Sequence, residues 1–202
     1  YTRITVAASA PTLYYQCSSH AGMGGQVNTN STFGSSNFSG SVQSTVSVNT
    51  TAGFSIVKWT GTGSAVTLGH GLGQKPDMFF VKRNGSSNWT VYTDVIDGSN
   101  DYLSLNNTSA KGDSSNPVAT TSVFQKSDTN GEEVIAYCFA SKTGYSRMGS
   151  YIGNGNDNGT FIYTGFKPAW VLTKQTNGGN YWHIHDNKRN PINVVGKNLK
   201  AD

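Results

Sequence analysis

The feature of this sequence that most restricts its fold is an internal duplication, at an offset of about 92 residues. The repeated unit is an aromatic segment, a glycine-rich turn, Lys-Pro, an apolar segment, an Asn-Gly turn and a tryptophan. The matched stretches are Gly53-Phe54-Ser55 with Gly144-Tyr145-Ser146, Trp59-Thr60-Gly61-Thr62-Gly63 with Tyr151-Ile152-Gly153-Asn154-Gly155, Lys75-Pro76 with Lys167-Pro168, Lys82 with Lys174, Asn84-Gly85 with Asn177-Gly178, and Trp89 with Trp182. Their common order indicates a tandem duplication.

The apolar residues come in short runs or alternate with polar ones, as strands do, and helical periodicity is nearly absent. β-branched and aromatic residues dominate these runs, and Gly, Asn, Asp or Pro bound them, for example at residues 54–59, 78–81, 89–92 and 170–172. Asn84-Gly85 and Asn177-Gly178 each lie between two such runs, and Asn-Gly is a strong hairpin signal. We predict an all-β protein of tandem duplicated β-sandwich, jelly-roll-like units.

The repeat divides the chain into four predicted segments. Residues 1–26 form an opening segment of different character, and residues 27–51, rich in Ser, Thr and Asn, are interpreted as a linker or a weakly patterned strand. Residues 52–143 are copy one, and residues 144–202 are a truncated copy two, without a counterpart of the apolar run around Cys138. Because unpaired edges promote aggregation, we expect either that another segment or subunit covers the sheet edge so exposed or that this chain is part of a longer one.

Composition narrows the class of protein. Charged residues make up only 13% of the chain, so Ser, Thr, Asn and Gly make its surface wettable, as in extracellular or particle-bound β proteins. The net charge of +4 is spread along the chain without the clustering that nucleic-acid binding requires. No window approaches the roughly 18 apolar residues that would span a membrane. We therefore expect neither nucleic-acid binding nor membrane insertion.

The opening segment contains a possible copper-binding loop. A predicted strand at residues 13–16 leads into Cys17, His20 and Met23, and this Cys-x2-His-x2-Met spacing resembles the copper loop of cupredoxins. That site needs a second histidine upstream, and no residue precedes Tyr1 here. We expect no bound cofactor, with copper possible only if upstream residues complete the site. The preferred alternative is a turn in which Cys17 and Met23 pack and His20 faces solvent.

Other candidate sites have plainer interpretations. No nucleophile elbow or phosphate loop occurs, and the aspartates that could form a glycosidase pair lie in turns, where they are better explained as turn formers (Asp97, Asp113, Asp128 and Asp157). His183 and His185 share one face of a predicted strand and are interpreted as a partly exposed pair rather than metal ligands. Cys138 is expected to be a buried free thiol. We predict that the chain is not an enzyme.

Four aromatic residues are candidates for ligand contact. Trp89, Tyr92, Tyr181 and Trp182 lie next to Asn/Gly turns, where flat rings could stack on sugars. The alternative is that the tryptophans cover the end of a β-sandwich core.

Several stretches in this order resemble virion proteins of marine tailed phages, especially cyanophages. The stretches are Leu13-Tyr14-Tyr15-Gln16-Cys17, His20-Ala21-Gly22-Met23-Gly24-Gly25, Gln43-Ser44-Thr45-Val46, Thr51-Ala52-Gly53-Phe54-Ser55-Ile56-Val57, Gly69-His70-Gly71-Leu72-Gly73, Ala136-Tyr137-Cys138-Phe139-Ala140 and Gly149-Ser150-Tyr151-Ile152-Gly153-Asn154-Gly155. Those proteins carry a cupredoxin-like segment followed by a twice-repeated β domain of unknown function. The resemblance implies a structural role in a tail or tail fibre at the particle surface.

The leading hypothesis is therefore a non-enzymatic virion protein of a tail fibre or appendage that contributes to host attachment. Its expected partners are other copies of itself in a homotrimer, other virion proteins and a host-surface glycan. A carbohydrate-binding module or adhesin is the alternative, and a copper-binding cupredoxin-type protein is the third possibility.

Overall fold

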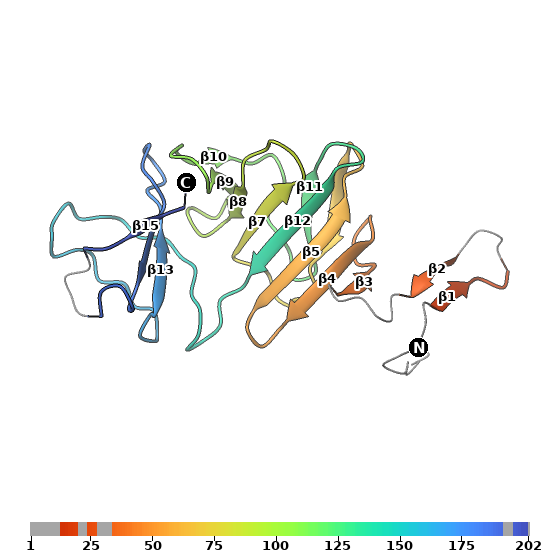
Figure 1. Ribbon diagram of the computed structural model, residues 1–202, viewed down its shortest axis with the longest axis horizontal. Coiled ribbons are helices and arrows are strands. Elements are labelled where there is room, and N and C mark those ends of the chain that lie inside the picture. Colours follow the sequence, from red (N-terminus) through yellow and green to blue (C-terminus); the bar gives the residue numbers. More distant parts are fainter. Residues whose placement is uncertain (1–12, 20–23, 28–33, 192–195, 202) are drawn as a thin grey trace.

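The structure is a computed structural model that describes residues 13–19, 24–27, 34–191 and 196–201, and the regular structure in these residues is entirely β (Figure 1). This confirms the predicted all-β class. The strands are β1 (Leu13–Gln16), β2 (Gly24–Val27), β3 (Ser35–Asn37), β4 (Ser44–Asn49), β5 (Phe54–Thr60), β6 (Ala65–Gly69), β7 (Met78–Arg83), β8 (Thr90–Thr93), β9 (Asp101–Ser104), β10 (Gly112–Asp113), β11 (Val123–Ser127), β12 (Glu133–Phe139), β13 (Trp170–Thr173), β14 (His183–Asp186) and β15 (Leu199–Lys200).

The centre of the molecule is an antiparallel sheet with the strand order β10-β9-β8-β7-β12-β5-β4-β3. Strand β12 lies in its middle and pairs with β5 on one side and β7 on the other. Because strand side chains alternate between faces, Val134, Ala136 and Cys138 all point to the buried side. The longest uninterrupted apolar run of the sequence therefore becomes the central strand.

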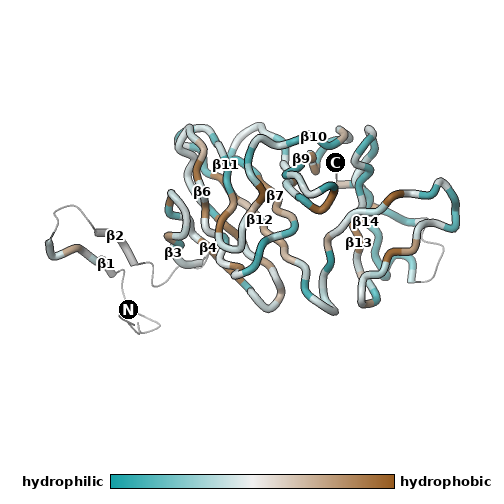
Figure 2. The backbone as a smooth tube through the Cα atoms, turned by 180° about the vertical axis from the view of Figure 1, so that it is seen from behind, coloured by the Kyte–Doolittle hydropathy of each residue, from teal (hydrophilic) through white to brown (hydrophobic). Residues whose placement is uncertain are grey.

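The short β6–β11 sheet forms a second layer over part of the large sheet, and Figures 1 and 2 show the two layers from opposite sides. Phe124 of β11 is 1% exposed and contacts the rings of Trp59 and Phe79 with centroid separations of 5.7 and 4.9 Å. Burial of one such ring stabilises the fold by roughly 1.5–3 kcal/mol. The hydrophobic core therefore lies between the two layers.

The segment interpreted as a linker or a weakly patterned strand contains strands. Within residues 27–51, β3 and β4 are strands of the central sheet, and β4 pairs with β5. Ser44 and Val46 are buried there, and the Ser44 hydroxyl donates a hydrogen bond to the Gly69 carbonyl at 3.1 Å. Ser and Thr fit a strand as well as a linker when they alternate with Val, so composition alone left both interpretations open.

The β7–β8 and β13–β14 hairpins share one strand register. Met78 pairs with Thr93 in the first hairpin, and Trp170 pairs with Asp186 in the second. Each of the four residue pairs of the first hairpin has its sequence counterparts paired with each other in the second hairpin. The sequence repeat is therefore also a repeat of backbone pairing in this part of the chain.

The two hairpins also close their turns in the same way. In each, the lysine that follows the run of apolar residues folds back and donates hydrogen bonds to carbonyl oxygens at the turn. The bonds run from Lys82 Nζ to Arg83 O (3.0 Å), Gly85 O (2.6 Å) and Ser87 O (2.9 Å), and from Lys174 Nζ to Gln175 O (2.8 Å) and Gly178 O (3.2 Å). The matched pair Gly63 and Gly155 likewise share a positive φ, of 79° and 67°.

Copy two packs on copy one through Trp182. This side chain is 3% exposed, lies against Val91 and Leu103, and donates from Nε1 to the Ser104 carbonyl at 2.7 Å. The sandwich and the β13–β14–β15 sheet consequently lie side by side along the longest axis of the view (Figure 1).

Much of copy two departs from copy one. Residues 145–152, which match β5, form no strand, whereas β5 itself is held between β4 and β12. Large apolar side chains in and beside this region are exposed: Tyr145, Tyr151, Ile152, Phe161, Ile162, Tyr163, Trp170 and Val171. Figure 2 shows hydrophobic stretches in the loops beside β13 and β14.

Candidate functional site

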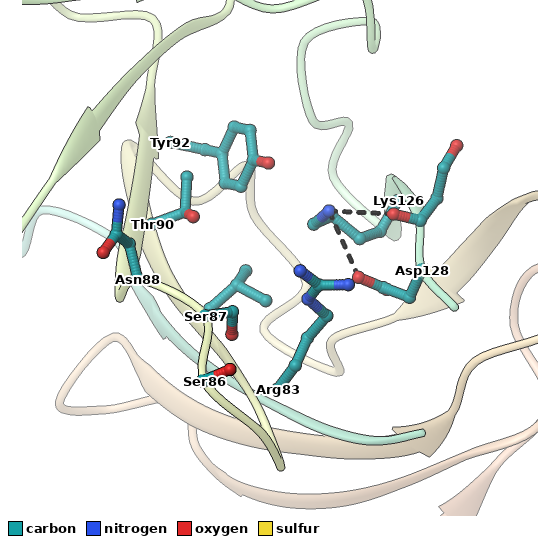
Figure 3. Close-up of a pocket in the computed structure, with 10 residues that line it drawn as sticks. Arg83, Ser86, Ser87, Asn88, Thr90, Tyr92, Lys126 and Asp128 are labelled. Carbon is teal, nitrogen blue, oxygen red and sulfur yellow. Dashed lines mark hydrogen bonds and ion pairs between the residues drawn. The ribbon is translucent and has the colours of Figure 1, made fainter. Parts of the chain in front are cut away.

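The candidate site is a pocket where the large sheet extends beyond the two-stranded layer that covers it (Figure 3). Its volume is about 530 Å³. Strands β7 and β8, the turn between them, and the end of β11 supply the lining, which is Val81, Arg83, Ser86, Ser87, Asn88, Thr90, Tyr92, Lys126, Ser127 and Asp128. The two-stranded layer is too small to cover the eight-stranded sheet. The sheet surface beside this layer therefore carries polar side chains in place of apolar ones.

Asp128 is the most unusual group in the pocket. Its side chain is 1% exposed, and neither carboxylate oxygen accepts a hydrogen bond from the part of the chain that the structure describes. In that part of the chain it forms one ion pair, with Lys126, whose Nζ lies 3.2 Å from Oδ1. A buried carboxylate needs hydrogen bonds as well as a countercharge, so these oxygens have unused capacity to accept them.

Lys126 is fixed by three contacts. Besides the ion pair with Asp128, its ammonium donates to the Ser127 carbonyl at 3.0 Å and lies 5.5 Å from the centre of the Tyr92 ring. Phe79 stacks on Tyr92 at a centroid distance of 5.1 Å. The ring of Tyr92 is therefore held by Phe79 and Lys126, and its hydroxyl points toward the pocket in Figure 3.

The rim of the pocket adds further polar groups. Arg83 donates to Thr129 Oγ1 at 3.0 Å and to Glu132 Oε2 at 3.2 Å, so its guanidinium is already oriented. Ser87 has a buried hydroxyl without a hydrogen-bond partner among the described residues. The lining contains the cations Arg83 and Lys126 and the carboxylate of Asp128, and Glu132, which pairs with Arg83, offsets the second cation from outside the lining. The site thus offers hydrogen-bond acceptors and donors around a cavity in which both cations are paired with carboxylates.

The four aromatic residues predicted to contact a ligand do not lie together at this site. Tyr92 lines the pocket, but Trp182 is buried between the two copies. Trp89 is half-buried and stacks on Tyr137 at 6.0 Å, and the Tyr181 ring lies under the Lys200 ammonium at 3.7 Å. Trp182 thus covers apolar surface between the two copies, and Trp89 packs on the face of β12 opposite the sandwich core.

The predicted copper ligands fall largely outside the described residues. Cys17 follows β1 and is half-buried, whereas His20 and Met23 belong to the part of the chain that is not described. Strands β1 and β2 pair with each other. Among the described residues no group of three or more His, Cys, Asp and Glu side chains is placed to hold a metal ion.

The two strand histidines and the second cysteine lie as the sequence pattern predicts. The His183 and His185 rings stack on one face of β14 at 6.3 Å, and both are half-buried. Cys138 is a buried free thiol, as predicted, and burial raises its pKa to about 12.

The sequence pattern around Asp128 indicates a turn former and gives no sign of the pocket. The residue does end a strand, but its backbone and side chain have separate roles: its carbonyl accepts from the Gly63 amide at 2.9 Å while its carboxylate faces the pocket. The nearest local signal was the Lys126-x-Asp128 spacing at the end of an aromatic strand, which is far too common to be specific.

Fold and site together define an all-β protein of packed antiparallel sheets with an open polar pocket. The described residues contain no helix that is long and apolar enough to cross a membrane. The chain belongs to the family described as Domain of unknown function (DUF7483), whose model matches residues 28–202. No curated protein and no solved structure matches the chain.

Proposed function

We propose that this protein is a non-enzymatic structural component of a virion tail fibre or appendage, and that it contributes to host attachment. The observation that carries the proposal is the packing of one hairpin onto its own duplicate, with shared register and a buried tryptophan between them. Repeated β units joined by apolar contacts build elongated bodies, and a low-charge surface suits exposure on a particle.

Partners follow from the exposed side chains of copy two. Eight large apolar residues between Tyr145 and Val171 are exposed in the single chain, and apolar surface of this kind marks sites of protein association. We assign this surface to contacts between copies, as a homotrimer, and with other virion proteins. The polar pocket lies outside this segment and stays open for a host-surface ligand.

The location is tested by labelling purified particles with antibodies raised against this chain and imaging them by electron microscopy. The proposal predicts label on a fibre or appendage and the polypeptide in the particle proteome. Particles that lack the polypeptide, with the protein present elsewhere in the same culture, would contradict it.

A carbohydrate-binding module or adhesin acting outside a particle is the second candidate, and the Asp128 pocket favours it. The two functions share a binding site and differ in location. The labelling experiment therefore separates them, since the second candidate predicts unlabelled particles together with a protein that binds glycans.

A further inference from the structure

We infer that the pocket at Asp128 binds a neutral saccharide through adjacent hydroxyl groups. The inference deepens the proposed attachment function and rests on it for its biological role. The binding chemistry follows from the pocket alone, beginning with the two carboxylate oxygens that accept no hydrogen bond within the described chain.

The carboxylate oxygens without hydrogen-bond partners determine which donors the ligand must supply. A buried carboxylate with unused acceptor capacity needs donors, and the two oxygens of Asp128 match two neighbouring hydroxyls of a sugar ring. Lys126 lies beside it and Tyr92 lines the same pocket, and both side chains can donate to ring or hydroxyl oxygens. A ligand that carries both donors and acceptors on adjacent atoms satisfies this set.

The charges around Asp128 argue against a metal ion and against an anionic sugar as the ligand. A metal ion at Asp128 would meet the Lys126 ammonium 3.2 Å from the carboxylate, and the described residues provide no second carboxylate in the pocket lining. An anion such as a sulfated or sialylated sugar would meet the buried negative charge of Asp128, while Arg83 is engaged by Glu132. A neutral ligand avoids both penalties.

Size and polarity agree with this assignment. A volume of about 530 Å³ lies within the usual range for small-ligand sites and holds one or two sugar rings. The lining is mainly hydroxyl, amide and charged groups, whereas sites for apolar ligands are lined mostly by apolar side chains. The aromatic ring present, Tyr92, is stacked on Phe79, so recognition uses hydrogen bonds more than ring stacking.

The test is calorimetric titration of the full chain with neutral mono- and disaccharides that carry vicinal diols, with their deoxy analogues, and with sialylated and sulfated glycans. The inference predicts binding of at least one neutral sugar and loss of binding when a hydroxyl of the diol is removed. Asp128→Asn should weaken it by at least about tenfold.

Two further variants keep the test independent of folding. Asn88→Ala changes an exposed rim residue of the pocket and should weaken binding severalfold without unfolding the chain. Asp113→Asn, whose side chain is 84% exposed and outside the pocket, is the matched control and should bind like the wild type.

Unchanged affinity in both Asp128→Asn and Asn88→Ala would overturn the site, and a preference for anionic glycans lost in Lys126→Met would overturn the ligand class. No binding to any neutral sugar would also overturn the inference. None of these results alters the antibody labelling of particles, so failure of the saccharide site and failure of the virion assignment are distinguishable.

Discussion

At the scale of single residues, a buried titratable side chain makes the stability of this fold depend on the pH of the solvent. His70 is fully buried: its Nδ1 accepts from the Leu72 amide and its Nε2 lies 3.2 Å from the Thr120 carbonyl. Burial lowers the pKa of His70, because the charged imidazolium would lose its hydration. The ring is thus held neutral with both nitrogens occupied.

His70 makes stability depend on pH. Since its pKa is lower in the folded than in the unfolded chain, the unfolded chain binds more protons below about pH 6.5, and stability falls as the pH falls. The slope from this group is at most about 1.4 kcal/mol per pH unit. Urea unfolding between neutral pH and pH 5 measures it, and His70→Gln should flatten the curve. The half-exposed His183→Gln serves as control; an identical pH dependence in His70→Gln would contradict the explanation.

Cys138 should be unreactive in the native protein. Burial raises its pKa to about 12, so almost no thiolate forms at pH 8 and reagents cannot reach it. In a Cys17→Ser background, we expect a thiol reagent such as dithionitrobenzoate to modify Cys138 only after denaturant is added. Rapid modification of the folded chain would show that β12 is not the central strand.

At the scale of elements, the β7–β8 and β13–β14 hairpins share the same strand register and the same contact between a lysine and its turn. Each has a lysine that binds the carbonyl oxygens of its own turn, and Lys174 also donates to the Thr108 carbonyl of copy one at 3.3 Å. Carbonyl oxygens in a turn lack strand partners, so an ammonium that reaches several of them fixes the turn.

Removing either lysine should loosen its hairpin. We expect Lys82→Met and Lys174→Met each to lower the free energy of unfolding by about 1–3 kcal/mol, because several carbonyls lose a charged donor while the aliphatic packing is kept. Chemical denaturation measures the effect, with Lys188→Met, an exposed residue, as the control. Wild-type stability in both variants would mean that the turns hold without their lysines.

Strands were predictable where a local pattern of apolar residues determines them. The pocket was not predictable, because segments distant in sequence form it. Alternating apolar residues placed β5, β7 and β13, and the Asn-Gly dipeptides placed two hairpins. The composition of residues 27–51 left linker and strand undecided, because the burial of β4 depends on its pairing with β5. Asp128 was missed because its environment comes from segments distant in sequence.

At the scale of the whole molecule, the interface between the copies determines whether the chain behaves as one body. Trp182 provides the largest buried contact from copy two, and its indole nitrogen is bonded to Ser104 O. Substitution of a buried tryptophan by alanine commonly costs about 3–5 kcal/mol.

We expect Trp182→Ala to lower stability by that amount and to uncouple copy two from the sandwich, giving two unfolding transitions by calorimetry. Trp170→Ala, at a residue that is 56% exposed, is the control and should cost less than about 1 kcal/mol. A single unchanged transition in Trp182→Ala would contradict the described packing.

Assembly is expected to cover the exposed apolar side chains of copy two. Sedimentation velocity should give a species of about three times the chain mass of 21.6 kDa, and Ile152→Lys, at a residue that is 89% exposed, should shift it toward the monomer. A wild-type chain that stays monomeric at high concentration would exclude the homotrimer.

The most direct test of the account is competition for attachment between the purified chain and whole particles. Host cells are incubated with the wild-type protein, with Asp128→Asn or with Asp113→Asn, and adsorption of virus is then counted. The account predicts that the wild type and Asp113→Asn reduce adsorption in proportion to their concentration and that Asp128→Asn does so far less. Adsorption that is the same with and without a saturating amount of the wild-type protein would contradict a role in host attachment.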